Sequence, residues 1–221
     1  MKPLFIILFI LSGITQATAF DTLRNFNHQH EQNDAGHWYD PITNFFGQKK
    51  PDTKNRDIII INKDRTITFN GHILKLMDPV EKWFKVFGKP DRKGQFNDVY
   101  IWDSKGLSIT LERGIKEEKV HSFTAQFRTY YETFPSDKLL GKRDDQGNFS
   151  SDYFKGVIKL EDGYLAREVT RDELRKSEVW KKFKRRAFPN TYSYRYKIEG
   201  PDQVNIIGFT PDGRMKRFGM Y

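Results

Sequence analysis

The sequence predicts an α+β protein in which short helices pack on one face of antiparallel sheets. Three observations carry this prediction. Short apolar runs are separated by turn residues along most of the chain, which is typical of strands joined in hairpins. A segment near residue 80 has the apolar spacing of an amphipathic helix. The sequence lacks the glycine-rich signatures of parallel nucleotide-binding sheets.

Three strands are expected at the start of the packed region. Residues 58–61, 66–69 and 72–76 are apolar runs separated by polar turns. The last of these turns contains Asn70 and Gly71, a pair that suits the tight turn of a two-residue hairpin.

The helix that follows has clear boundary residues. Asp78 is the expected N-cap, Pro79 the first helical residue and Gly88 the end of the helix. The apolar residues fall on one helical face, which we expect to be buried on a sheet. They are Val80, Trp83, Phe84 and Phe87.

The second half of the chain echoes the first. The string FNGHILKL at residues 69–76 is similar to FKGVIKL at residues 154–160. Each string precedes an expected helix and further strands, and the second helix should run from its N-cap Thr170 towards Arg186. We predict two tandem β-α-β-β repeats, with ordinary reuse of strand and turn patterns as the alternative.

The pattern divides the chain into five expected segments. A signal peptide and a flexible arm precede two α+β halves, which a turn-rich loop connects. In chain order, the signal peptide, arm, first half, loop and second half are residues 1–19, 20–57, 58–134, 135–151 and 152–221. Further strands are expected at residues 98–102, 107–111, 120–128, 130–134, 204–209 and 215–220.

Residues 1–19 have the layout of a secretory signal peptide. Lys2 is followed by an apolar run at residues 4–11 and by an A-x-A sequence that ends at Ala19, which predicts cleavage before Phe20. The apolar run is shorter than the roughly 18 residues that a membrane-spanning helix needs, so export is favoured over a membrane anchor. We expect a periplasmic or secreted protein.

The composition limits the chemistry. The chain has 38 Lys and Arg residues against 29 Asp and Glu residues, a formal net charge of +9, and no cysteine. Disulfides, thiolate metal sites, cysteine nucleophiles and a lipid-anchoring cysteine are therefore excluded. We expect no cofactor. The positive charge favours an acidic protein or another polyanion as partner, with an anionic membrane surface as the alternative.

A histidine-rich segment is a candidate metal site, because imidazole and carboxylate ligands suit zinc, copper or nickel. The segment has no rigid frame, so we expect a solvated tail there. Its residues are His28, His30, Glu31, Asp34 and His37.

The expected helix over residues 171–186 carries a basic face. At about 100° per residue, Trp180 and Phe183 fall on one side and several cations on the other. These cations, which we term the cationic ridge, are Lys181, Lys182, Lys184 and Arg185. The ridge is either a solvated helix face or a surface that recruits an acidic protein, an anionic membrane or a nucleic acid.

A tyrosine stripe follows the ridge. Tyr192, Tyr194 and Tyr196 alternate, so their rings lie on one face of an expected strand. Such a stripe is either a half-buried edge of the core or, beside lysine and arginine, part of a binding surface.

Asp103, Glu112 and His121 form a candidate acid–base group. They lie on or beside neighbouring expected strands and would converge if the hairpins pair in register. That arrangement would fit a secreted hydrolase that acts on a polyanion.

The sequence contains the strings FNGHILKL, VYIWDSKGL (residues 99–107) and VNIIGFTPDGRM (residues 204–215). Over residues 65–221 it resembles an uncharacterised family of exported bacterial domains, with an F-x-G strand, a helix, a W-D-x-x-G-[IL] hairpin and a late F-T-x-D-G turn. Residues 79–127 are also similar to the small outer-membrane assembly lipoprotein fold, although the anchoring cysteine is missing. The shared motifs are structural, so the resemblance implies a fold and no catalytic residue.

These observations predict an exported binding protein without enzymatic activity, which uses the cationic ridge and the tyrosine stripe. An immunity-type partner of an acidic toxin is one version. The alternatives are the secreted hydrolase and an envelope scaffold that docks on anionic lipid.

Overall fold

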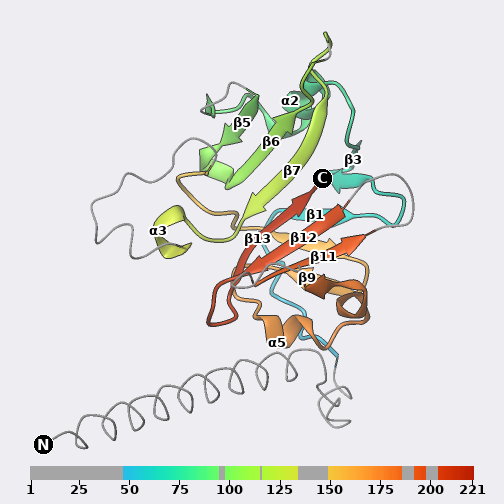
Figure 1. Cartoon of the computed structure of the whole chain (residues 1–221), viewed down its shortest axis with the longest axis vertical. Coiled ribbons are helices and arrows are strands. Elements are labelled where there is room, and N and C mark those ends of the chain that lie inside the picture. Colours follow the sequence, from blue (N-terminus) through green and yellow to red (C-terminus); the bar gives the residue numbers. More distant parts are fainter. Residues whose placement is uncertain (1–46, 95–97, 115, 134–148, 186–191, 198–203) are drawn as a thin grey trace, which may run out of the picture. The chain divides into compact units, whose positions relative to one another are not determined.

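The computed structural model describes residues 47–94, 98–114, 116–133, 149–185, 192–197 and 204–221, whose strands form a large sheet and a small sheet (Figure 1). The strands of the large sheet are β4 (Arg92–Lys93), β5 (Val99–Trp102), β6 (Leu107–Leu111), β7 (Val120–Gln126), β10 (Lys184–Arg185), β11 (Ser193–Lys197), β12 (Val204–Phe209) and β13 (Met215–Met220). Those of the small sheet are β1 (Ile58–Ile61), β2 (Ile67–Phe69), β3 (His72–Leu74), β8 (Val157–Leu160) and β9 (Gly163–Leu165).

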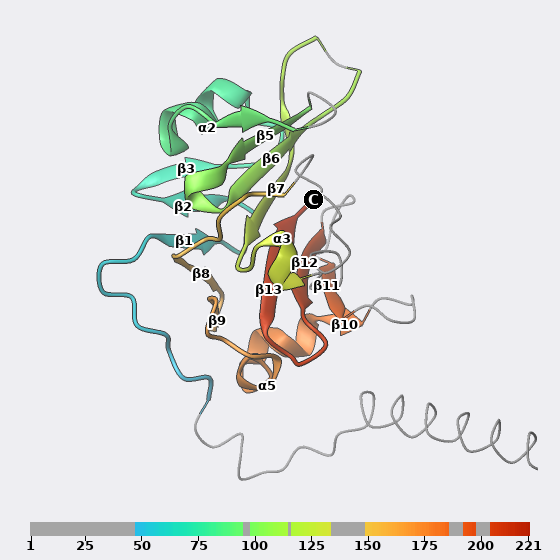
Figure 2. The ribbon, with the colours of Figure 1, turned by 90° about the vertical axis from the view of Figure 1, so that its left-hand side faces the viewer.

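The strand order shows how the sheets are built. It is β10-β11-β12-β13-β7-β6-β5-β4 in the large sheet and β3-β2-β1-β8-β9 in the small sheet. Neighbouring strands in the described residues are antiparallel except β1 and β8, which run parallel with Ile58 opposite Val157. In Figure 2 the small sheet and the β11–β13 part of the large sheet lie as two layers. The α+β prediction is confirmed, with one parallel pair added.

The helix α2 (Val80–Phe87) packs on the inner face of the large sheet, as its apolar spacing predicts. The Trp83 ring lies 5.8 Å from the Phe123 ring of β7. The Phe87 ring lies 4.9 Å from the Phe69 ring of β2, which belongs to the small sheet. The helix therefore ties both sheets into one hydrophobic core.

The predicted N-cap of this helix at Asp78 is wrong. Pro79 occupies the N-cap position, and the Val80 N–H donates to the carbonyl of Glu118 at 2.9 Å. The Asp78 carboxylate accepts a hydrogen bond from Lys82 Nζ instead. Backbone pairing with the β6–β7 turn thus replaces the side-chain cap.

The predicted continuous helix over residues 170–186 is also wrong. The segment forms α5 (Arg171–Leu174), a 3-10 turn η3 (Glu178–Lys182) and then β10. The first part of the prediction holds, because the Thr170 hydroxyl accepts the Glu173 N–H at 3.2 Å as an N-cap.

The helix ends early because the side chain of Asp162, in the turn between β8 and β9, caps a new helical turn. The Asp162 carboxylate accepts the N–H groups of Glu178 and Val179 at 2.7 and 2.9 Å. The new turn brings the Trp180 ring to within 4.7 Å of the Tyr194 ring of β11. Burial of this aromatic residue against the large sheet thus replaces an exposed amphipathic helix.

A strand predicted at residues 130–134 is a short helix instead, α3 (Tyr130–Thr133). The Glu132 carboxylate accepts the Thr129 N–H at 2.9 Å, and the Thr129 hydroxyl accepts the Glu132 N–H at 3.4 Å. This reciprocal capping box satisfies the N–H groups at the helix start and outweighs the strand preference of the aromatic residues.

The two halves of the chain repeat one connectivity. In the large sheet, β12, β11 and β10 lie outward of β13 in the same order in which β6, β5 and β4 lie outward of β7. Pro79 before α2 forms an isolated bridge with Lys119 of the β6–β7 turn, and Thr170 before α5 forms one with Arg214 of the β12–β13 turn. The repeat has more strands than the predicted β-α-β-β unit. The two similar strings fall on different elements, because FNGHILKL covers the end of β2, the turn and β3, whereas FKGVIKL leads into β8 alone.

Gly106 allows residues 149–154 to lie against the β5–β6 turn. Its φ is 66°, and a Cβ atom there would overlap the backbone of Tyr153 and Phe154. The Phe154 N–H donates to the carbonyl of Gln126, whose own N–H donates to the carbonyl of Gly106. A side chain at Gly106 would therefore push this segment off the sheet.

We expect Gly106→Ala to lower the free energy of unfolding by more than about 3 kcal/mol, because it adds a backbone clash to an unfavourable φ. Gly114→Ala is the matched control, since Gly114 has a φ of 84° and open space where a Cβ would lie. This control should lose only about 1 kcal/mol. Urea unfolding measures both values, and equal losses would contradict the close contact at Gly106.

Candidate binding hollow on the outer face of the large sheet

The face of the large sheet opposite α2, here the outer face, carries a grid of hydroxyl side chains. On β6 and β7, small polar residues alternate with residues of the core, so they share the outer face. The pairing sets Thr110 opposite Ser122 and Ser108 opposite Thr124. Four hydroxyl groups on two adjacent strands therefore lie side by side.

This grid is the floor of a hollow of ≈ 410 Å³. The volume lies within the range of roughly 300–1,000 Å³ that is usual for ligand-binding clefts. Ser108, Ser122 and Gln126 are 8%, 3% and 5% exposed. These polar side chains thus lie at the bottom of a depression and not on an open sheet surface.

Two glycines of the outer face make room for longer side chains. A Cβ atom on Gly219 would lie 2.6 Å from the ring of Tyr221, so this ring lies across the glycine. A Cβ atom on Gly208 would lie 3.3 Å from Cγ of Arg217, which crosses the second glycine. Tyr221 and Arg217 both line the hollow from this side.

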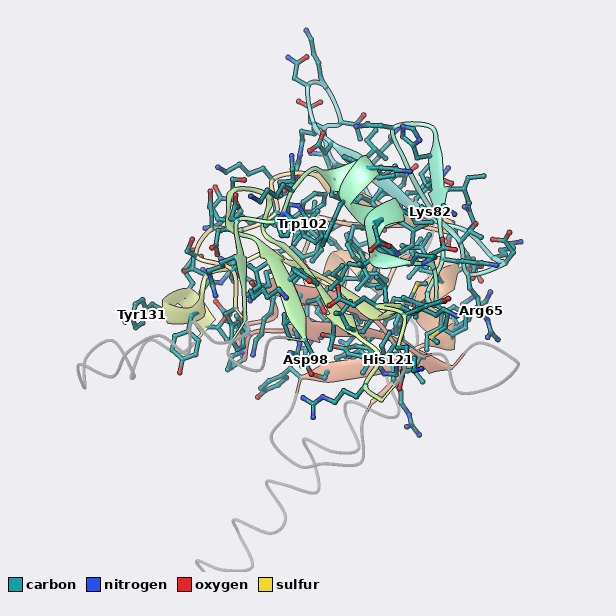
Figure 3. The ribbon with its side chains drawn as sticks, turned by 90° about the horizontal axis from the view of Figure 1, so that it is seen from above. Arg65, Lys82, Asp98, Trp102, His121 and Tyr131 are labelled. Atoms are coloured by element: carbon teal, nitrogen blue, oxygen red, sulfur yellow. The ribbon has the colours of Figure 1, made fainter. Side chains whose placement is uncertain are left out.

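The opposite end of the hollow is acidic. The Asp98 side chain is 13% exposed, and its Oδ2 atom accepts a hydrogen bond from Arg113 Nε at 2.6 Å. Its Oδ1 atom is buried and has no hydrogen-bond donor among the described residues. Figure 3 shows Asp98 at the edge of the described body and Trp102 deeper inside. Asp98 thus lines the hollow with one carboxylate oxygen that no described donor satisfies.

The end beside β13 is cationic. Arg217 pairs with Gln126 across the β13–β7 ladder, and within the described residues its guanidinium has no carboxylate partner. Arg195 of β11 lies on the same outer face, is exposed and also lacks a carboxylate partner in the part of the chain described. Burial, together with the charge of Arg217, lowers the pKa of Lys216 to about 8. The electrostatic potential at this end is therefore positive.

Phe149 borders the hollow on one side, and residues 149–151 are held in place by Arg92 and Asp103. The carbonyl of Phe149 accepts a hydrogen bond from Arg92 Nη2 at 2.6 Å. Asp103 accepts the Ser151 N–H at 2.7 Å and pairs with Arg92 Nε at 2.7 Å. Although burial raises the pKa of Asp103, the hydrogen bonds from Arg92 and Ser151 outweigh it and lower this pKa below its ordinary value.

A family model matches residues 58–175, more than half of the chain, and its description is a domain of unknown function, DUF7738. The chain belongs to the DUF7738 family. No curated protein matches the chain, and no solved structure matches it. The match confirms an uncharacterised domain family. Within DUF7738 lie the hydroxyl floor and Asp98, whereas Arg195 and Arg217 follow the matched residues.

The cationic ridge does not form on this DUF7738 member as predicted. Lys181 Nζ lies 2.6 Å from Glu178 Oε2, and Lys182 Nζ lies 2.7 Å from Glu161 Oε2. The hydrogen bond to Glu161 raises the pKa of Lys182. The positive charges of these two lysines are therefore neutralised by neighbouring carboxylates.

The other two ridge residues belong to a strand. Lys184 and Arg185 of β10 pair with Arg195 and Tyr194 of β11. β10 is a strand and not part of a helix, so the four cations do not share one helical face. The ridge required the helix that Asp162 interrupts.

The tyrosine stripe lies on the inner face of β11. Tyr194 is 5% exposed, and the Tyr196 ring lies 5.6 Å from the Phe183 ring. Tyr192 is partly buried against the same core. The stripe is thus an edge of the core, and a binding role for its three rings stays a prediction.

The acid–base group is only partly brought together. His121 Nδ1 lies 2.6 Å from Glu112 Oε2, and both side chains are partly exposed. Asp103 lies beyond the other end of β6, roughly 15 Å or more away along the strand, where it binds Arg92. The three residues therefore do not share one cleft.

The candidate metal ligands lie outside the described residues, as do the expected signal peptide and most of the expected arm and loop. Within the described residues, no group of three or more His, Asp or Glu side chains could hold a metal ion. No helix in that part of the chain is long and apolar enough to cross a membrane. The ligands concerned are His28, His30, Glu31, Asp34 and His37.

We expect Asp103→Asn to destabilise the protein by about 1–3 kcal/mol at pH 6, because it removes a charged partner of Arg92 and Ser151. The folded-state pKa of Asp103 is lowered, so its contribution is present above the unfolded pKa near 4 and is lost as pH falls through the folded pKa. The free-energy difference between the variant and the wild type should therefore shrink as the pH falls below about 4.

Urea unfolding at several pH values measures this difference. Asp172→Asn is the control, because the Asp172 side chain is 78% exposed and should contribute little at any pH. A difference for Asp103→Asn that stays constant down to pH 3 would contradict the role of its ionised carboxylate.

Proposed function

We propose that this protein is an exported, non-enzymatic binding protein that holds a polyanion on the outer face of the large sheet. The observation that carries the proposal is the pair Arg217 and Arg195, which lie on this face without carboxylate partners among the described residues. Gly208 and Ser193 pair in the row of Arg217, and Arg195 lies two residues further along β11, so the Cα atoms of the two arginines lie roughly 12 Å apart. Successive anionic groups of one chain could reach both.

The charges around the hollow support an anionic ligand. Arg113 and Asp98 neutralise each other at the acidic end, and among the described residues no carboxylate compensates the guanidinium of Arg217 in the lining. A guanidinium binds carboxylate or phosphate with two parallel hydrogen bonds, and these are stronger than hydrogen bonds between neutral groups. The net charge, which is +9 for the full sequence and +8 once Lys2 is removed with residues 1–19, adds a long-range attraction for any polyanion.

A binding function is favoured over a hydrolase function because the three residues of the acid–base group do not come together. Only Glu112 and His121 meet, while Asp103 holds residues 149–151 in place through Arg92 and Ser151. The carboxylate that a hydrolase would use is thus committed to the wall of the hollow.

We expect Arg217→Glu to weaken polyanion binding by at least about tenfold, because an anion replaces the uncompensated cation. Lys181→Glu is the matched control: it changes the net charge equally, but its lysine already pairs with Glu178. Isothermal titration with alginate, polyphosphate and polyglutamate measures the affinities, which should fall with added salt. The proposal fails if none of these probes binds, or if Lys181→Glu weakens binding more than Arg217→Glu does.

We also propose export through residues 1–19, on the strength of their three-part layout. The chain purified from the periplasm or the medium should begin at Phe20 when its terminus is sequenced. Ala19→Arg should block cleavage, because the signal peptidase needs a small residue at that position. An uncleaved wild-type chain found in the cytosol would refute export.

A further inference from the structure

The inference that follows rests on the proposed function and concerns the chemical class of polyanion that binds in the hollow. We infer that the ligand is an acidic polysaccharide, whose sugar hydroxyls lie on the floor of the hollow and whose carboxylate binds Arg217. The inference depends on the floor hydroxyls and on Asp98, because a polyanion without hydroxyl groups would leave their hydrogen-bonding capacity unused.

The hydroxyl groups of the floor are complementary to a ligand that both donates and accepts hydrogen bonds. Hydroxyl groups of Ser108, Thr110, Ser122 and Thr124 can each donate one hydrogen bond and accept others. Ionised phosphate and carboxylate groups can only accept. Sugar hydroxyls do both, so they match the floor better than polyphosphate or the side chains of polyglutamate do.

Asp98 sharpens this distinction. Its Oδ1 atom is buried and accepts no hydrogen bond from the described residues, while Arg113 uses the other oxygen. An anionic group placed there would find no uncompensated cation, because Arg113 already pairs with the carboxylate, whereas a hydroxyl group could donate to the carboxylate. The ligand must therefore carry O–H or N–H donors at the Asp98 end and an anionic group at the Arg217 end.

The size and walls of the hollow suit a sugar chain. From β5 to β13 there are three strand spacings, or roughly 14 Å, which is longer than a single small anion. The rings of Tyr221 and Phe149 line the hollow and offer apolar surface to the C–H groups of a sugar ring. Beyond Arg217, Arg195 on the same face is placed for the next acidic unit of the chain.

The test compares probes that separate charge from hydroxyl chemistry, using the full chain. Alginate oligomers should bind, while neutral dextran and alginate with its carboxyl groups reduced should bind at least about tenfold more weakly. Polyphosphate and polyglutamate should also bind more weakly than alginate. Isothermal titration measures each affinity at the same salt concentration.

Variants of the floor add a second readout. The double variant Ser122→Ala, Thr124→Val should weaken alginate binding by about tenfold, and Asp98→Asn should weaken it by a similar factor. Asp98→Asn should leave polyphosphate binding unweakened, because polyphosphate has no hydroxyl group that donates to this carboxylate. Ser104→Ala, at an exposed position of the β5–β6 turn, is the matched control. Unchanged unfolding temperatures show that the variants are folded.

The outcomes distinguish this inference from the proposed function. One outcome is that polyphosphate or polyglutamate binds as tightly as alginate and that Arg217→Glu abolishes this binding. That result would support the polyanion site and refute the inference that its ligand is a polysaccharide. Binding confined to vesicles of anionic lipid also refutes the polysaccharide. If no polyanion binds at all, both proposals fall. Selective alginate binding that depends on Asp98 and on the floor hydroxyls supports the inference.

Discussion

The antiparallel pairing of β7 with β13 is the constraint on which the candidate site depends. It joins the two halves of the chain into one sheet and sets Arg217 opposite Gln126 and Gly219 opposite Thr124. A slip of one residue would turn Arg217 to the inner face and expose Phe218, which is fully buried. Burial of Phe218 therefore fixes on which face, and beside which hydroxyls, the cation lies.

The repeated connectivity explains how one sheet holds two kinds of chemistry. Both hairpins have a register shift at the same place, which leaves His121 as the extra residue in the first and Lys216 in the second. The residues after the shifts, Ser122 and Arg217, are therefore equivalent positions of the repeat. In the first half a hydroxyl faces Thr110, and in the second an arginine lies over Gly208. The two hairpins have the same backbone arrangement, and their different side chains place the neutral hydroxyl floor beside the cation Arg217.

Local signals predicted much of the fold but little of the site. The Asn70 turn, the apolar face around Trp83 and most strands follow from neighbouring residues, and the structure confirms them. The helix after Thr170 fails because Asp162, distant in sequence, accepts its N–H groups, and the ridge fails because Glu161 from the β8–β9 turn meets Lys182. The hydroxyl floor did leave a signal, since serine and threonine alternate with core residues on β6 and β7. That Arg217 has no carboxylate partner within the described part of the chain depends on long-range strand pairing, which no local pattern contains.

The same long-range contacts decide where an anion would bind. A ligand at Lys181 or Lys182 must first displace a carboxylate, and such surface ion pairs contribute only about 0–1 kcal/mol each, so little is gained by exchanging one partner for another. At Arg217 no described carboxylate has to be displaced. The hydroxyl floor beside it offers further hydrogen-bonding groups to the same ligand. A ligand there forms new hydrogen bonds without breaking an ion pair of the described residues, so position, not the number of cations, favours the hollow.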